Sequence, residues 1–135
     1  MQSIANRQGF DSTEVDVDAL ANRLFADGYA IAPALLDPAT TDRLYSELDP
    51  HFSAASFGRG MFYGAETKRF GAVLKRSREA QSIVVHPAVL AIMERALGDW
   101  CQCLQLNLTQ AIEIHPAAPV QAPHRDQDMW AGPKG

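Results

Sequence analysis

The sequence predicts an α+β fold in which helices come first and strands follow. Apolar residues recur every three to four positions through most of the first hundred residues, and from residue 104 they alternate with polar residues. The first spacing is typical of amphipathic helices and the second of a strand. A chain with this order of elements belongs to the α+β class, with a β-sandwich or barrel forming at its C-terminal end.

Composition narrows the classes of function. The chain has 135 residues, 47% of them apolar, which suits one globular domain. Its net charge of −4 lacks the basic excess of a nucleic-acid-binding protein. No apolar run approaches the roughly 18 residues of a membrane span. The polar N-terminus lacks a signal peptide, and Cys101 and Cys103 are interpreted as reduced, so a cytoplasmic location is expected.

Helical signals begin after a flexible leader, residues 1–12, that shows no periodicity. A helix is predicted from Val17 to Phe25. Thr13 or Asp16 supplies a side-chain cap at its start, and Gly28 follows where a left-handed residue is favoured.

A second helix is predicted to start at Asp37-Pro38, after a short strand at 29–32. Aspartate is a good cap, and proline is tolerated in the first helical turn. We expect Pro50 to end this helix, because proline breaks the hydrogen-bonding pattern. Its buried face is predicted to comprise Leu44, Tyr45 and Leu48.

The middle of the chain combines a loop with two further helices. Residues 51–71 are rich in glycine, serine and aromatic residues, which predicts a long loop with short extended pieces. Ser77 is predicted to cap a helix that reaches Val85. Pro87 then opens another helix, which Gly98 ends.

Residues 104–114 have the period of a strand. Their even positions are apolar except for Gln110, and their odd positions are mostly polar. Such a length suits a bent or broken strand of a barrel or sandwich. After a proline-rich turn, a second extended piece is predicted from Gln121 to Trp130.

The most informative motif is His124-Arg125-Asp126, within that second extended piece. Residues two apart on a strand point to the same side, so an imidazole and a carboxylate would face one metal ion. This pair suits Fe(II), and a second histidine would complete a facial triad. A surface histidine bonded to a nearby acid would give the same pattern. The polar face of the preceding strand, and Trp130 as the wall of an apolar pocket, favour the metal site.

Two stretches, residues 107–115 and 121–130, resemble the first core strands of the phytanoyl-CoA dioxygenase family. Residues 28–37 and the helix 89–97 are similar as well, so the resemblance runs from about residue 18 to the end. It implies that residues 1–135 are the N-terminal portion of one domain. In that domain, N-terminal helices pack on an incomplete double-stranded β-helix of the jelly-roll or cupin type.

The resemblance also implies a function and a set of site residues. Fe(II), bound by His124 and Asp126, and the cosubstrate 2-oxoglutarate would use O₂ to hydroxylate a small organic substrate. Asp126 favours hydroxylation, because related halogenases have a small residue there. Asn107 lies where a strand residue contacts 2-oxoglutarate, Thr109 points with it, and Arg69 lies near where a basic residue assists. A polar barrel position and a solvated basic face are the alternative interpretations.

The sequence departs from the family pattern after Asp126. The family supplies its second histidine and an arginine for 2-oxoglutarate on later strands, yet residues 127–135 contain neither. His115 precedes the motif and is a candidate substitute ligand.

We therefore expect a truncated chain that is inactive alone, binds iron weakly and self-associates through exposed strand edges. A non-catalytic jelly-roll module that binds a small ligand is the alternative. A third hypothesis is an unrelated jelly-roll domain in which the His124-Arg125-Asp126 motif occurs by chance.

Overall fold

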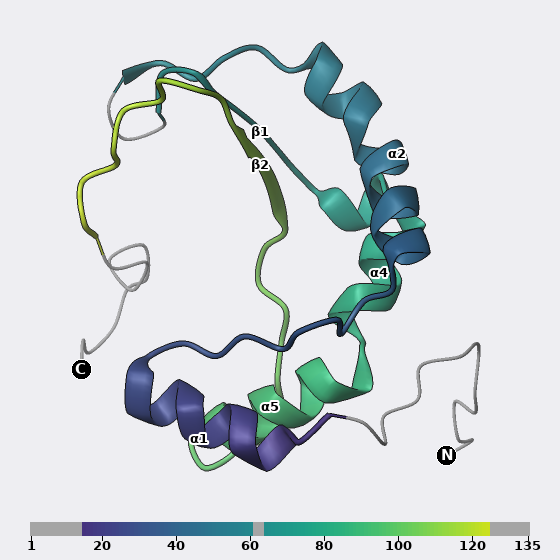
Figure 1. The fold of residues 1–135 in the computed structure, drawn as a ribbon, viewed down its shortest axis with the longest axis vertical. Helices are drawn as coiled ribbons and strands as arrows, with labels where there is room; N and C mark the ends of the chain where they lie inside the picture. The colour runs from purple at the N-terminus through teal and green to yellow at the C-terminus, as the bar shows by residue number, and fades with distance from the viewer. Residues whose placement is uncertain (1–14, 61–63, 125–135) are drawn as a thin grey trace.

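The computed structural model of the chain describes residues 15–60 and 64–124. Helices and a small antiparallel sheet alternate along it, which confirms the α+β class. The helices α1 (Val17–Asp27) and α5 (Pro87–Leu97) lie side by side at one end of the molecule (Figure 1). The strands β1 (Thr67–Gly71) and β2 (Gln110–Ile114) lie toward the other end. The predicted leader, residues 1–12, lies outside the described residues.

The first helix follows the prediction closely. Asp16 caps α1, where its Oδ1 accepts a hydrogen bond of 2.9 Å from the N–H of Ala19. Gly28 ends it in the left-handed conformation, with φ of 79°, and its N–H donates to the carbonyl of Leu24. Ala21 is 1% exposed, on a helix that packs against α5.

The second helix, α2 (Pro38–Ala54), starts where predicted and ends later. Asp37 accepts hydrogen bonds from both the N–H and the hydroxyl of Thr40, at 2.8 and 2.9 Å. These bonds, the backbone one first, lower the pKa of Asp37 below its ordinary value. The prediction that Pro50 ends the helix was wrong. The last turn persists because the ring of Phe52 packs edge-on against Phe70, at 4.8 Å between centroids.

Two smaller predictions were also wrong. Residues 29–32 form no strand, since within the described chain no strand pairs with them and Tyr29 and Ile31 are largely exposed. Tyr45 is 68% exposed. It lies about 100° around the helix from Leu44, which is half-buried, and so falls outside the stripe that faces the rest of the molecule.

The sheet consists of β1 and β2 in antiparallel register, from Thr67 opposite Ile114 to Gly71 opposite Gln110. The strand predicted over 104–114 is therefore five residues long. Residues 104–109 are irregular, because β1 ends at Gly71 and leaves no partner for them in the described chain. A two-stranded sheet does not show the jelly roll implied by the resemblance.

The last two helices confirm their predicted starts. The helix α4 (Arg78–Val84) is capped by Ser77, whose Oγ accepts a hydrogen bond from the N–H of Ala80. The helix α5 is capped by His86, whose Nδ1 accepts from the N–H of Ala88. Gly98 follows α5 as predicted, although it keeps right-handed backbone angles. None of the helices in the described ranges is long and apolar enough to cross a bilayer.

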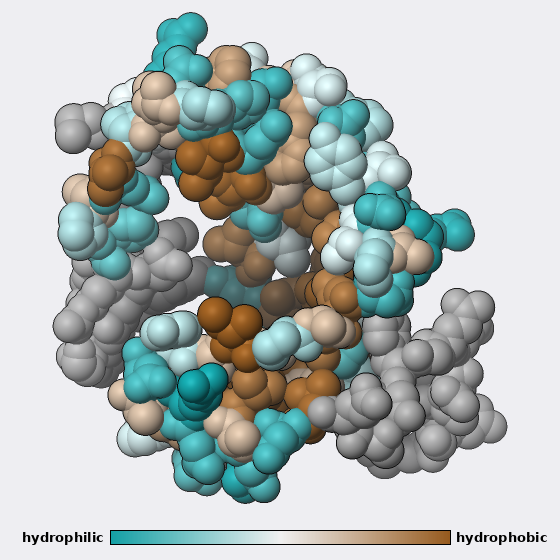
Figure 2. All heavy atoms as spheres, in the orientation of Figure 1, coloured by the Kyte–Doolittle hydropathy of each residue, from teal (hydrophilic) through white to brown (hydrophobic). Residues whose placement is uncertain are grey.

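The core of the described residues is small, and much apolar surface is uncovered. Ile112 and Ile114 are 49% and 72% exposed, whereas the odd positions of β2 are the better covered ones. Figure 2 shows apolar side chains open to solvent in the middle of the view, between the helices and the strands. The buried apolar residues are small ones: Ala21, Val73, Ala80 and Ala88.

Candidate functional site

Arg69 and Thr109, two of the predicted cosubstrate residues, do not line the same pocket. Directly opposed residues of an antiparallel pair lie on the same face. Arg69 is opposite Ile112, and Lys68 is opposite Glu113, so these two pairs occupy different faces. Thr109 lies just before β2, and it lines a pocket to which Arg69 does not belong.

Asn107 and Thr109, by contrast, come together in one pocket with a volume of about 220 Å³. The pocket lies between the irregular segment before β2 and the short 3₁₀ helix η2 (Val73–Lys75). The basic residue Lys75, whose side chain is exposed, is among the lining residues. The lining comprises Ala72, Leu74, Lys75, Leu106, Asn107, Leu108 and Thr109.

One hydrogen bond joins the two walls of this pocket. The N–H of Val73 donates to Oγ1 of Thr109 at 3.1 Å, between residues 36 apart in the sequence. Because β1 and β2 are paired immediately beside this bond, the two walls are fixed relative to each other. A pattern read along one segment cannot signal such a contact, which explains why Lys75 was not predicted as a site residue.

The pocket wall contains a strained backbone residue. Ala72 adopts left-handed angles, φ 56° and ψ 42°, which cost a residue with a side chain roughly 1–2 kcal/mol. This conformation turns the chain out of β1 and into η2. Strain of this kind persists where surrounding contacts hold it, as the bond from Val73 to Thr109 does here.

A polar network fixes the far end of η2. Ser77 donates its hydroxyl to Glu47 at 2.5 Å, and the same carboxylate oxygen accepts the N–H of Glu79 at 3.1 Å. The bond from Ser77 is the main reason that the pKa of Glu47 lies below its ordinary value. Arg43 pairs with Glu79 at 2.5 Å. Together these contacts hold α4, and with it η2, against α2.

The imidazole of His124 is exposed and contacts the backbone two residues before it. Its Nδ1 lies 3.0 Å from the carbonyl oxygen of Ala122. A carbonyl oxygen only accepts, so Nδ1 is the donor in this contact. Metal-binding histidines are commonly oriented in this way by a backbone carbonyl. With Nδ1 engaged by this carbonyl, Nε2 is the nitrogen through which His124 would bind a metal ion.

The second predicted ligand, Asp126, lies outside the described residues, as do Arg125 and Trp130. The prediction that His124 and Asp126 face one ion therefore stays a prediction. Residues 121–124 are irregular, so the described part of the second extended piece is not in a strand. Across residues 15–60 and 64–124, no three or more histidine, cysteine, aspartate or glutamate side chains gather as a metal site would need.

The candidate substitute ligand, His115, is engaged at the end of β2. Its Nε2 lies 3.4 Å from Oε1 of Glu113, and its ring meets that of Phe57 edge-on at 4.9 Å. Its backbone N–H donates to the carbonyl of Glu66. These contacts tie the strand end to the loop before β1.

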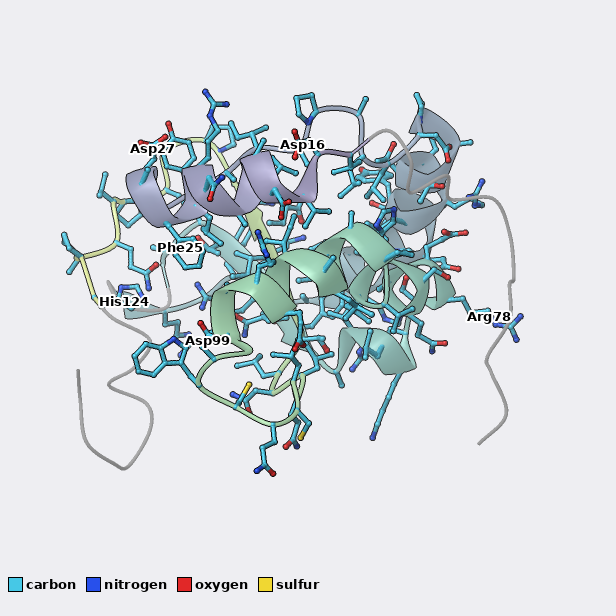
Figure 3. All side chains as sticks on the ribbon, turned by 90° about the horizontal axis from the view of Figure 1, so that it is seen from below. Asp16, Phe25, Asp27, Arg78, Asp99 and His124 are labelled. Atoms are coloured by element: carbon cyan, nitrogen blue, oxygen red, sulfur yellow. The ribbon has the colours of Figure 1, made fainter. Side chains whose placement is uncertain are left out.

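The pocket and His124 are separate in this structure. In Figure 1, η2 follows β1 on the side of α2 and α4, whereas the chain end that carries His124 lies across the strands from it. Figure 3 shows His124 at the end of the molecule where Phe25 and Asp99 lie, far from Arg78 of α4. The structure thus brings Asn107 and Thr109 together but does not bring His124 to them.

Comparison with known proteins connects this chain to one family. The family model described as "Phytanoyl-CoA dioxygenase (PhyH)" matches residues 25–135. That range includes all five predicted site residues.

Two curated relatives carry dioxygenase names. "Dioxygenase trt7" of Aspergillus terreus is 30% identical over 124 residues, covering 84% of this chain and 42% of the relative. "Dioxygenase FrzG" of Cladobotryum sp is 28% identical over 141 positions, covering 86% and 44%. The chain thus spans less than half the length of these relatives. No solved structure gives a significant match.

Proposed function

Because the chain belongs to the phytanoyl-CoA dioxygenase family, we propose that it carries part of the active site of an Fe(II)- and 2-oxoglutarate-dependent dioxygenase that hydroxylates a small organic substrate. Both curated relatives are named dioxygenases, which supports an oxygenase with a small-molecule substrate and O₂. The iron, the cosubstrate and the hydroxylation are our proposal.

The observation that carries the proposal is the orientation of His124. The hydrogen bond from Nδ1 to the carbonyl of Ala122 presents Nε2 as a ligand. With Asp126 as the carboxylate, the two side chains supply two of the three ligands of a facial triad. Bound iron and 2-oxoglutarate would supply the oxidising chemistry, and the protein would supply orientation and charge.

Asn107 and Thr109 are proposed to orient the cosubstrate. The hydroxyl of Thr109 accepts from Val73, so its own hydrogen remains for donation to a carboxylate. The amide of Asn107 offers two more donors to the same pocket. Arg69 is proposed, from the resemblance alone, as a basic residue near the cosubstrate, although it does not line the pocket of Asn107 and Thr109.

An anoxic calorimetric titration of the full chain with Fe(II), followed by 2-oxoglutarate, tests the proposal. We expect reversible iron binding weaker than micromolar, which His124→Gln and Asp126→Asn abolish. His51→Gln and Asp99→Asn are matched controls that leave iron binding unchanged. Micromolar or tighter binding would contradict a two-ligand site, and insensitivity to both ligand variants would contradict the assignment of His124 and Asp126.

A non-catalytic module that binds a small ligand is the second candidate, because the pocket at Asn107 and Thr109 requires no metal. Formation of succinate from 2-oxoglutarate separates the two functions. Stoichiometric binding of 2-oxoglutarate without iron, and without succinate in a protein that extends over the full length of the family, would favour the module.

A further inference from the structure

Lys75 differs from the neighbouring basic residues in what it contacts. Arg76 donates from Nε to the carbonyl of Gly71 at 3.2 Å and lies against His51. Lys68 donates to the carbonyl of Phe52 at 3.1 Å, and Arg43 pairs with Glu79. Within the described residues, the exposed side chain of Lys75 has no such acceptor, and the residue is part of the pocket lining.

The chemistry of the pocket matches a small organic acid. Its polar groups, on Lys75, Asn107 and Thr109, can all donate hydrogen bonds, and no acidic residue lines it. The remaining lining, including Leu74 and Leu108, is apolar. A volume of about 220 Å³ lies below the range of drug-sized ligand pockets, so a small molecule is expected.

The walls are held in place before any ligand arrives. The strained turn at Ala72, the bond from Val73 to Thr109 and the bond from Arg76 to Gly71 all fix η2 beside the segment that precedes β2. These contacts hold the backbone of both walls and the hydroxyl of Thr109, whereas the side chains of Lys75 and Asn107 are exposed.

We propose that Lys75, with Asn107 and Thr109, forms a subsite that binds a carboxylate of a small organic acid. The inference rests on the proposed function, since the carboxylate belongs either to 2-oxoglutarate or to the organic substrate. Lys75 is the residue that supplies the charge, and Arg69 does not line this pocket.

The test compares carboxylate binding by the full chain and by Lys75→Met, which keeps the length of the side chain and removes its charge. Calorimetry is run with 2-oxoglutarate, with hexanoate as an acid with an apolar body, and with hexanamide as its uncharged counterpart. Loss of one charged hydrogen bond should weaken acid binding by roughly tenfold or more and leave hexanamide unaffected. Lys75→Arg should largely restore the affinity, and Arg78→Gln, an exposed control, should match the parent.

The two acids distinguish the source of the carboxylate. Weakened 2-oxoglutarate binding assigns the subsite to the cosubstrate, and weakened hexanoate binding alone assigns it to the organic substrate. Equal affinity of the parent and Lys75→Met for both acids, or no binding of either acid by the parent, would overturn the subsite. If the parent binds hexanoate through Lys75 but binds no 2-oxoglutarate with iron present, the proposed function fails and the subsite stands.

Discussion

The N–H of Val73 and the hydroxyl of Thr109 form a hydrogen bond of 3.1 Å that closes the pocket between η2 and the start of β2. Both residues lie just outside the paired ends of the strands, so the bond continues the contact between the strands after their ladder stops. The position of the candidate cosubstrate residues therefore depends on a tertiary contact between distant segments.

Replacing Thr109 with valine should open this pocket. The change keeps the shape of the side chain but leaves the N–H of Val73 without its partner, which costs about 1–3 kcal/mol when the group is buried. We expect a lower melting temperature and weaker 2-oxoglutarate binding. Thr109→Ser keeps the hydroxyl and should retain most of both properties. Equal binding by the valine and serine variants would show that the hydroxyl has no role in the pocket.

Ala72 provides a test of the strained turn. Glycine adopts left-handed angles without penalty, so Ala72→Gly should leave the stability unchanged or raise it by up to about 1 kcal/mol. The same substitution at Ala91, within α5, should lower stability by about 1 kcal/mol. Chemical denaturation measures the free energy of unfolding of both variants. A similar loss of stability at the two positions would show that the backbone of Ala72 is not strained.

Glu47 should make the free energy of unfolding depend on pH. Its pKa in the folded chain is lowered by the hydroxyl of Ser77, so its contribution is present above the unfolded pKa and is lost as pH falls through the folded value. Stability should decline below about pH 4.5, with Asp37 contributing in the same direction at lower pH. Glu47→Gln should melt earlier at neutral pH and show a flatter decline in acid. Glu94→Gln serves as the control, and a parallel decline in both variants would contradict this role.

Pro50 lies inside α2, four residues before its end. Proline removes the hydrogen bond to the carbonyl of Ser46 and crowds it, so Pro50→Ala should stabilise the chain by about 1–3 kcal/mol. The gain should appear in thermal denaturation together with increased helical signal in circular dichroism. A loss of stability would indicate that the helix ends at Pro50, as the sequence alone suggested.

The sequence predicted those features that depend on neighbours along the chain. Asp37 and Ser77 were predicted as caps, and Asp16 was one of two candidates with Thr13. In the structure each of the three accepts a hydrogen bond from an N–H three residues later. Features that depend on distant segments were missed. The observed strand β2 is shorter than the strand predicted over 104–114, because its partner β1 ends at Gly71. No pattern within residues 104–114 reveals where the partner ends.

In the candidate site too, local features were predicted and features that depend on distant segments were missed. The motif at His124 and the polar parity of Asn107 and Thr109 are local and were found from the sequence. Lys75 enters the pocket only because η2 folds back onto the segment before β2. Arg69 lies opposite Ile112 and does not line the pocket, and this position is set by the pairing of two strands that are far apart in the chain.

We propose that His124 binds the metal through Nε2, together with Asp126. Paramagnetic broadening by Mn(II), a substitute for Fe(II), tests it directly in the full chain labelled for nuclear magnetic resonance. The imidazole signals of His124 should broaden first, those of His51 and His86 should stay sharp, and Asp126→Asn should remove the effect. Broadening that spares His124, or that persists in Asp126→Asn, would contradict the account.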